Sequence, residues 1–257
     1  MKAEPQQTID RITLKAFRAP DEPALCDEFI REHEQVLSDF GIPLTVKPDN
    51  SWVNDPECYV IVALHAELGM VGGIKLQMDN GKRKLPMLEA VEKMDPRIAD
   101  ELAQLRVNGN GEVCGLWNAN RYANRGVPIL LSLAVTAIAT QAEARHMVCF
   151  VAHYTKKHPS KNGFIVMENI GEKGSFDYPV PRIKSICMVN PDTVLLPHAS
   201  LDQRQRIFSL RLRPQLERIE NPSGTELLVQ YDLLIGDFAV DMVAYQGILK
   251  DRLSYSA

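Results

Sequence analysis

Long apolar runs alternate along the chain with segments of helical periodicity. The runs CYVIVAL (residues 58–64) and MVCFVAH (residues 147–153) are typical of strands buried on both faces. A further run, MVGGIKLQM (residues 70–78), follows the first after a short polar bend, so these two strands are predicted to form a hairpin. The adjacent Gly72 and Gly73 indicate a bulge or the close approach of a neighbouring segment.

Segments with apolar residues at helical spacing separate the strands, and prolines in their first turns favour three of the helix starts. The predicted helices span residues 21–40, 85–105 with a break at Pro96, 127–145, 201–219 and 237–253. Further strands are predicted at residues 12–16, 112–118, 182–189 and 226–234. Strand 112–118, helix 127–145 and strand 147–153 would form a right-handed crossover, which usually has a binding crevice at the carboxyl end of its first strand.

Composition is that of an ordinary soluble globular protein. The chain has 257 residues, 45% of them hydrophobic, and a net charge of −4, so no overall basic field favours nucleic acid. The polar N-terminal segment is unlike a signal peptide, and the best membrane candidate, residues 127–139, is too short. We therefore expect a cytoplasmic protein without nucleic-acid or membrane partners. We also expect one domain over residues 1–257, with its core at 10–190 and C-terminal additions at 200–257.

Cysteine and histidine spacing gives no metal signal. The five cysteines are widely spaced and include no C-x-x-C pair, which favours reduced thiols over a disulfide framework or a zinc site. His153 and His158 have no further ligand at metal-binding spacing. No metal is therefore expected.

A polar turn, NANRYANRG (residues 118–126), lies directly before the apolar helix predicted at residues 127–145. The start of a helix has unpaired backbone N–H groups and a partial positive charge, which suit an anion. Gly126 gives the turn conformational freedom and Asn124 tolerates the left-handed region, while Arg121 and Arg125 suit phosphate oxygens. The turn is predicted to bind phosphate. Solvated arginines before an ordinary core helix are the alternative.

The segment RYANRG (residues 121–126) resembles the R/Q-x-x-G-x-G/A pyrophosphate loop of the GNAT superfamily of N-acyltransferases, with Asn124 in place of the first glycine. EVCGLWN (residues 112–118) resembles the fourth strand of that family, MVGGIKLQ the strand before it, and Gly163-Phe164 the family's G-F pair. The resemblance covers roughly residues 58–189. It implies an α/β fold with a central, mixed, twisted sheet flanked by helices and carrying C-terminal helical additions.

The same resemblance implies direct acyl transfer from acetyl-CoA or another acyl-CoA, as co-substrate, to a small-molecule amine. The pantetheine arm of the donor would lie along the backbone of the fourth strand, and its pyrophosphate would lie on the turn. The residues implied are Leu116, Trp117 and Asn118 for pantetheine, and Arg121, Asn124, Arg125, Gly126 and Val127 for pyrophosphate.

Acyl transfer needs a base for the amine and benefits from an acid for the leaving thiolate. Glu112, at the head of the fourth strand, is the first candidate base and Glu67 a weaker one; a solvated glutamate is the alternative for Glu112. In the family a tyrosine before the G-F pair often supplies the acid, but Pro159 stands there. Tyr154 is the substitute candidate, with an ordinary strand-end residue as the alternative.

The long segment 79–111 and the C-terminal additions resemble the autoinducer-synthase and N-acyl-amino-acid-synthase branch, in which acyl carrier protein delivers some donors. This branch implies an apolar tunnel, lined by residues such as Leu116, Val148 and Phe150. Residues 17–57 and 165–181 are expected to build the acceptor pocket. A homodimer is left open, as are two rival functions: a CoA- or acyl-binding sensor without turnover, and a scaffold using the C-terminal helices.

Overall fold

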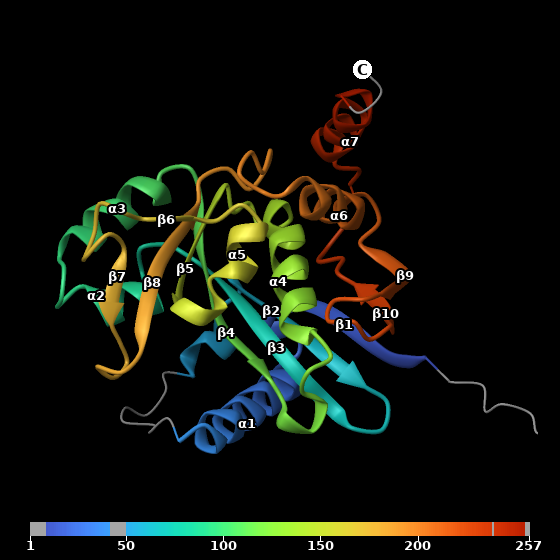
Figure 1. Cartoon of the computed structure of the whole chain (residues 1–257), viewed down its shortest axis with the longest axis horizontal. Coiled ribbons are helices and arrows are strands. Elements are labelled where there is room, and N and C mark those ends of the chain that lie inside the picture. The colour runs from blue at the N-terminus through green and yellow to red at the C-terminus, as the bar shows by residue number, and fades with distance from the viewer. Residues whose placement is uncertain (1–8, 42–49, 238, 255–257) are drawn as a thin grey trace, which may run out of the picture.

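Ten strands form one mixed sheet in the computed structural model, which describes residues 9–41, 50–237 and 239–254. The strand order is β6-β8-β5-β4-β3-β2-β1-β10-β9, and β7 pairs with β8 outside this path. Helices cover both faces of the sheet (Figure 1). The predicted fold class, an α/β fold around a mixed sheet, is confirmed.

The first half of the chain forms the predicted elements with small shifts at their ends. β2 and β3 pair antiparallel as the predicted hairpin, and Pro96 separates α2 from α3 because proline lacks a backbone donor. The elements are β1 (Asp10–Arg18), α1 (Pro23–Asp39), β2 (Cys58–His65), β3 (Gly69–Met78), α2 (Pro86–Val91), α3 (Arg97–Arg106) and β4 (Asn110–Asn118).

Two helices in the second half end earlier than the sequence predicted. The helix expected at residues 127–145 is α4 (Val127–Ala137) with a 3₁₀ turn after it, and the one expected at 201–219 is α6 (Leu201–Leu212) followed by a strand. Pro214 disfavours helix at the residue before it, so α6 ends there. The remaining elements are β5 (His146–Ala152), α5 (Lys157–Lys161), β6 (Ile165–Val166), β7 (Ser175–Asp177), β8 (Lys184–Asn190), β9 (Gln215–Glu220), β10 (Leu227–Asp232) and α7 (Met242–Ser254).

Two layers of helices bury the two faces of the sheet. α4 is apolar on nearly all sides and packs on β2, β3 and β4, with Leu130 and Leu131 fully buried. α1 packs on the opposite face, where Phe29 meets Trp117 edge to face at 5.7 Å between ring centroids. α2 and α3 cover β5 and β8 on this second face, burying Val148.

The paired glycines of β3 allow both helix layers to approach the sheet. A Cβ atom at Gly72 would lie 2.9 Å from Val127 of α4, and one at Gly73 would lie 2.4 Å from the Phe29 ring of α1. The pairing of β3 with β2 shifts register beside Gly72: Ala63 pairs with Gly72 and Leu64 with Met70, which leaves one extra residue in β3. The sequence predicted a bulge or a close approach, and β3 has both.

All five cysteines are free thiols. Among the described helices, none combines the length and the apolar character that crossing a membrane requires.

Candidate functional site

β4 and β5 separate in the middle of the sheet. They pair in parallel at Asn110–His146, Gly111–Met147 and Glu112–Val148, and no further pairing between them occurs in the described chain. The edge of β4 from Val113 to Asn118 therefore does not pair with β5. Such an edge offers backbone N–H and C=O groups to an extended ligand.

A bulge at Gly115 turns β4 away from β5. Lys75 of β3 pairs with Cys114 but Gly73 pairs with Trp117, so two β4 residues, Gly115 and Leu116, face one residue of β3. Gly115 has φ +61°, a left-handed conformation that glycine adopts without the steric cost of a side chain.

A cavity of about 420 Å³ lies beside this bulge, on the α1 face of the sheet. α1 contributes five of its twelve lining residues, and Tyr178 approaches from the loop before β8. Its lining residues are Phe29, Ile30, His33, Glu34, Leu37, Asn50, Trp52, Lys75, Pro86, Cys114, Gly115 and Tyr178. Eight of the twelve come from the two segments expected to build an acceptor pocket, residues 17–57 and 165–181. Residues 42–49 of the first segment lie outside the described residues.

Three side chains of this cavity, His33, Trp52 and Lys75, were not selected from the sequence. Burial lowers the pKa of His33 to about 4, and the positive charge of Lys75 acts in the same direction. His33 is therefore uncharged at neutral pH. The Lys75 ammonium lies 4.0 Å from the centroid of the Trp52 ring, a cation–π contact. His33 lies on α1, Trp52 on the 3₁₀ turn Ser51–Asn54 and Lys75 on β3, so only the packing of these elements brings them together, and no local sequence signal identifies them.

Glu112 is not the solvated strand-end residue that was the alternative to catalysis. Glu112 is 2% exposed, and its side-chain carboxyl group accepts a hydrogen bond of 2.8 Å from the backbone N–H of Met87. Burial raises the pKa of Glu112 to about 8, and this hydrogen bond and the charge of Lys75 only partly offset the rise. Glu112 lies at the closed end of the β4–β5 opening and does not line the cavity.

The turn before α4 has the backbone expected of an anion site. Asn124 has φ +64° and Gly126 has φ +75°, so both adopt the left-handed region. No acceptor among the described residues takes the backbone N–H groups of residues 124–127. Such a run of N–H groups at a helix start suits a phosphate.

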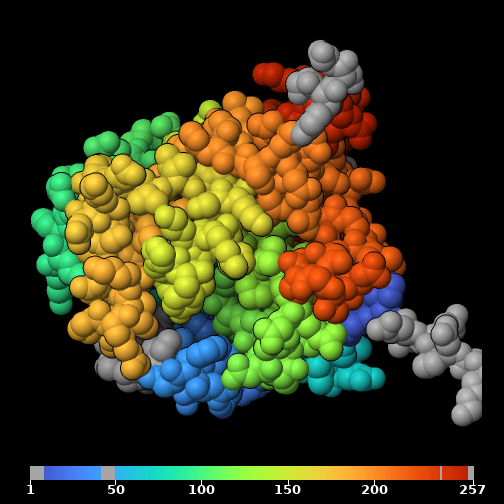
Figure 2. Space-filling view, viewed as in Figure 1, coloured from blue at the N-terminus to red at the C-terminus, as the bar shows by residue number. Residues whose placement is uncertain are grey.

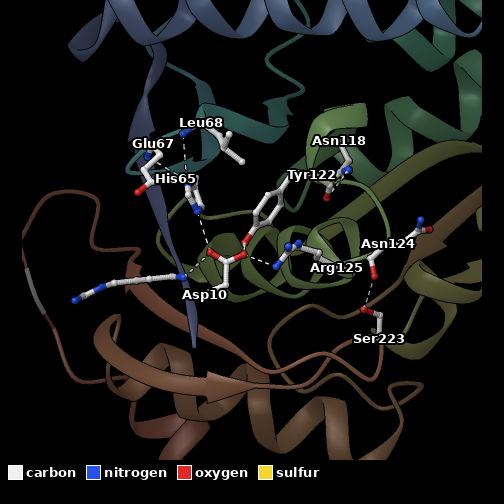
Figure 3. A network of polar contacts seen from close by, with 10 residues as sticks. Asp10, His65, Glu67, Leu68, Asn118, Tyr122, Asn124, Arg125 and Ser223 are labelled. Atoms are coloured by element: carbon white, nitrogen blue, oxygen red, sulfur yellow. Dashed lines mark hydrogen bonds and ion pairs between the residues drawn. The ribbon is translucent and has the colours of Figure 1, made fainter. Parts of the chain in front are cut away.

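Both arginines of the turn bind protein groups, and Figure 3 shows the contact of Arg125. Arg121 forms an ion pair of 2.7 Å with Glu32 of α1 and donates to the Met70 carbonyl. Arg125 pairs with Asp10 of β1 and stacks on the Tyr122 ring. The arginine side chains thus fix the turn to α1 and β1, which the sequence did not indicate.

Asp10 is the centre of a polar network (Figure 3). Its carboxylate accepts hydrogen bonds of 2.9 Å from the Tyr122 hydroxyl and from Nε2 of His65, whose Nδ1 accepts the N–H groups of Glu67 and Leu68. Burial alone would raise the pKa of Asp10, but these two hydrogen bonds and the charge of Arg125 lower it overall. Glu67, the weaker candidate base, contributes only its backbone N–H here.

The loop between β9 and β10 packs against the same turn. A Cβ atom at Gly126 would lie 2.6 Å from the Pro222 side chain, and the Ser223 hydroxyl donates to the Asn124 carbonyl at 2.9 Å. Gly126 is thus needed for this contact as well as for the turn. Figure 2 shows the surface hollowed between the yellow α5 region and the orange-red β9–β10 hairpin, with green α4 residues at its floor.

The other predicted site residues occupy different surroundings. Tyr154 follows β5 and is 74% exposed, while Trp117 is buried under α1. Leu116, 36% exposed, lies on the face of β4 opposite Trp117, because side chains alternate along a strand. The Asn118 side chain donates to the carbonyls of Ala119 and Tyr122, which stiffens the start of the turn.

The residues expected to line an acyl tunnel are divided between the two faces. Val148 is fully buried under α2 and α3, and Phe150 stacks with Tyr178 at 5.3 Å between centroids. Leu116 lies on the α4 face. Among the described residues, no group of three or more His, Cys, Asp or Glu side chains is arranged to hold a metal ion.

The fold is similar to that of solved acyltransferases. The N-acyl amino acid synthase FeeM from uncultured soil microbes superposes with a TM-score of 0.55 at 19% identity, over 76% of this chain and 98% of that one. The CoA-dependent acyl-homoserine lactone synthase BjaI, solved with SAM and isopentyl-CoA, superposes at 0.52 and 13% identity, over 93% and 99%. A further CoA-dependent acyl-homoserine lactone synthase, MesI, gives 0.50 and 13%, over 78% and 95%.

No family model matches the sequence, and no curated protein matches it. At these identities the likeness establishes the fold. The chain has the GNAT-like acyltransferase fold in the form found in autoinducer and N-acyl amino acid synthases.

Proposed function

We propose that the protein is an N-acyltransferase that transfers an acyl group from an acyl-CoA, or from an acyl carrier protein, to an amine. The observation that carries this proposal is the opening of β4 from β5 at the Gly115 bulge, with a cavity directly beside it. An extended thioester on the free β4 edge and an amine in the cavity would meet at the bulge. Holding both reactants in this way removes much of the entropic cost of their reaction.

The donor would bind through its pantetheine arm, whose amides resemble a peptide backbone, and through its pyrophosphate. The pantetheine amides would pair with the β4 edge near Leu116, Trp117 and Asn118. The pyrophosphate would accept hydrogen bonds from the N–H groups of residues 124–127, whose left-handed conformations at Asn124 and Gly126 orient them together. Arg121 and Arg125 would act by holding the turn in place, since protein carboxylates already occupy them.

In the reaction the amine nitrogen attacks the thioester carbonyl carbon. The new C–N bond forms, the C–S bond breaks, and sulfur leaves with its electron pair while the amine proton passes to a base. His33 lines the cavity and is uncharged at neutral pH, so it can accept that proton. Glu112 is the second candidate. Its pKa of about 8 means that it can accept a proton only at alkaline pH, and it would need water to reach the amine because it is buried and does not line the cavity. The thiolate takes a proton from solvent or from Tyr154, which lies on the open surface.

Binding of the donor is tested by thermal unfolding with CoA, acetyl-CoA and a long-chain acyl-CoA. A ligand at about 100 times its dissociation constant stabilises by roughly 2.7 kcal/mol. That raises the melting midpoint by about 2–4 °C per kcal/mol for a chain of this size. Leu116→Trp should abolish the shift by filling the opening beside β4. Leu249→Trp on α7, a leucine of similar exposure at 42%, is the matched control and should keep it.

Turnover is then measured as thiol release with a panel of amines. Release that needs both donor and amine supports the transferase. A ligand-binding module without turnover is the second candidate, favoured by the enclosed Glu112 and the exposed Tyr154. Donor stabilisation without release for any amine or donor would favour that module. Absence of stabilisation and of release with CoA and carrier-protein donors would contradict both.

A further inference from the structure

The C-terminal helix α7 projects from the molecule above α6 (Figure 1). One face of α7 packs on α6: the Arg204 side chain donates to the Asp251 carboxylate at 3.1 Å, and a Cβ atom at Gly247 would lie 2.5 Å from the Phe208 ring. Ala244 is fully buried. Because Ala244, Gly247 and Asp251 lie three and four residues apart, they form one helix face, and this face fixes α7 to the molecule.

The opposite face of α7 is an exposed apolar stripe, whose members also follow a spacing of three and four residues. They are Met242, Tyr245, Leu249 and Leu253. At about 100° per residue they lie on the side of the helix away from α6. All four are between 42% and 72% exposed. A helix with apolar residues on opposite faces is typically buried on both, and exposed apolar patches on proteins commonly bind another protein.

This stripe is complementary to a second copy of itself in the antiparallel orientation. The midpoint between Met242 and Leu253 and the midpoint between Tyr245 and Leu249 both fall beside Gly247. A two-fold axis at this level would pair Met242 with Leu253 of the partner subunit, and Tyr245 with Leu249 of the partner subunit. Every apolar residue of the stripe then meets another apolar residue, as a two-fold symmetric interface requires.

The charges at the two ends of α7 favour the same orientation. Asp237 and Asp241 lie at its N-terminal end, whereas Lys250 and Arg252 lie towards its C-terminal end. Antiparallel pairing brings the acidic end of each helix near the basic end of the other, and parallel pairing would bring like charges together. The dipoles of the two helices also attract each other when they are antiparallel.

We propose that α7 is the interface of a homodimer, in which the apolar stripe of one chain packs antiparallel on that of a second copy. Two helices form a small interface, so the dimer is expected to dissociate at micromolar concentrations. The lining residues of the cavity beside the β4 bulge include none from α7. Each chain therefore keeps its own cavity, and the inference does not depend on the proposed acyl transfer.

The test measures the mass of the protein in solution over a range of concentrations by sedimentation equilibrium. The variants Leu249→Glu and Leu249→Lys each place two like charges, one from each chain, near the middle of the interface. Met94→Glu is the matched control, because Met94 is a similarly exposed apolar residue, at 46%, in the connection between α2 and α3. Leu249 points away from α6, so folding of the single chain should not depend on it.

Wild type and Met94→Glu should form dimers with the same dissociation constant. Each Leu249 variant should raise that constant by at least about 100-fold, because a charge without a partner would be buried at the centre of the interface. An equimolar mixture of Leu249→Glu and Leu249→Lys should recover the dimer, since the mixed pair brings opposite charges together. Unfolding midpoints at high dilution, where all four proteins are monomers, should agree and thereby show that the variants remain folded.

Three results would overturn the proposal. The first is a wild type that stays monomeric at every concentration measured. The second is a dimer that persists in both Leu249 variants, because another surface would then form the contact. The third is a mixture of the two variants that remains monomeric, because two copies of α7 would then not face each other.

Discussion

Glu112 shows how the surroundings of one residue change its chemistry. Burial raises the pKa of this carboxyl to about 8, whereas an unfolded glutamate titrates near its ordinary value of 4.5. Between pH 4.5 and pH 8, Glu112 is therefore protonated in the folded state and ionised in the unfolded state. The contribution of Glu112 to stability is full below about pH 4.5 and is lost as pH rises through 8.

Glu112→Gln should remove this pH dependence, because glutamine is neutral and its amide oxygen can still accept from Met87. The wild type should lose up to a few kcal/mol of unfolding free energy relative to Glu112→Gln between pH 5 and pH 8. Urea unfolding of both proteins across this range measures the difference. A constant difference at all pH values would mean that Glu112 does not titrate there.

The two candidate bases, His33 and Glu112, make opposite predictions for activity. His33 lines the cavity, so His33→Gln should lower kcat by about 10²- to 10⁴-fold, the usual contribution of a general base. Glu112→Gln should change kcat only a few-fold. His198→Gln, an exposed histidine before α6, is the control. Steady-state kinetics with a saturating donor measure kcat of the variants. A larger loss of kcat in Glu112→Gln than in His33→Gln would assign the base to Glu112.

At the level of elements, the bulge in β4 controls both the shape of the opening and the position of Lys75. Gly115→Ala places a Cβ in a left-handed conformation and 3.2 Å from the Lys75 side chain. We expect a loss of about 1–2 kcal/mol in unfolding free energy from the backbone alone. We also expect weaker acyl transfer, because Lys75 must move.

Gly224→Ala separates these two effects. Gly224 also has a left-handed φ, +88°, but a Cβ there would meet nothing within 4 Å. Denaturant unfolding should show a similar backbone cost in both variants, whereas kcat/KM should fall only in Gly115→Ala. Equal activity of the two variants would mean that the bulge needs no glycine for function.

The sequence predicted the central elements well because their signals are local. Apolar runs identified β2, β3 and β5, and prolines in first turns marked α1, α2 and α4. The site was predicted only in part. The turn at residues 118–126 has glycine, asparagine and a following helix in sequence order, so its conformation could be inferred. The cavity is lined by α1, Trp52, Lys75 and Tyr178, which tertiary packing brings together, and no single segment encodes that packing.

Contacts between segments distant in sequence were not predicted. Asp10 and Glu32 bind the two arginines of the turn, and a contact of these arginines with phosphate stays a prediction. Residues 215–219 were included in the helix predicted at residues 201–219, which was wrong beyond Leu212. They instead complete a sheet edge by pairing with β10.

Across the whole molecule, β1 and the β9–β10 hairpin both contact the proposed phosphate turn. β1 pairs in parallel with β10, so the β9–β10 loop lies over the turn where Arg125 reaches Asp10. Ser223 adds a hydrogen bond from this loop to Asn124. The turn is therefore held by β1 on one side and by a C-terminal hairpin on the other, and its geometry depends on segments far from it in sequence.

Asp10→Asn tests this dependence. Asparagine keeps the size of Asp10 but removes the charge that holds Arg125 and weakens acceptance from Tyr122 and His65. We expect a loss of about 1–3 kcal/mol in unfolding free energy, typical of disrupted hydrogen bonds to a charged group, and a higher KM for the acyl donor with little change in kcat. The folded pKa of Asp10 is lowered, so its stabilisation is present above about pH 4 and is lost as pH falls further.

Glu217→Gln is the control. It breaks the exposed Arg11–Glu217 pair, and it should cost well under about 1 kcal/mol and leave KM unchanged. A donor KM that stays at the wild-type value in Asp10→Asn, despite the loss of stability, would show that the turn keeps its geometry without the network.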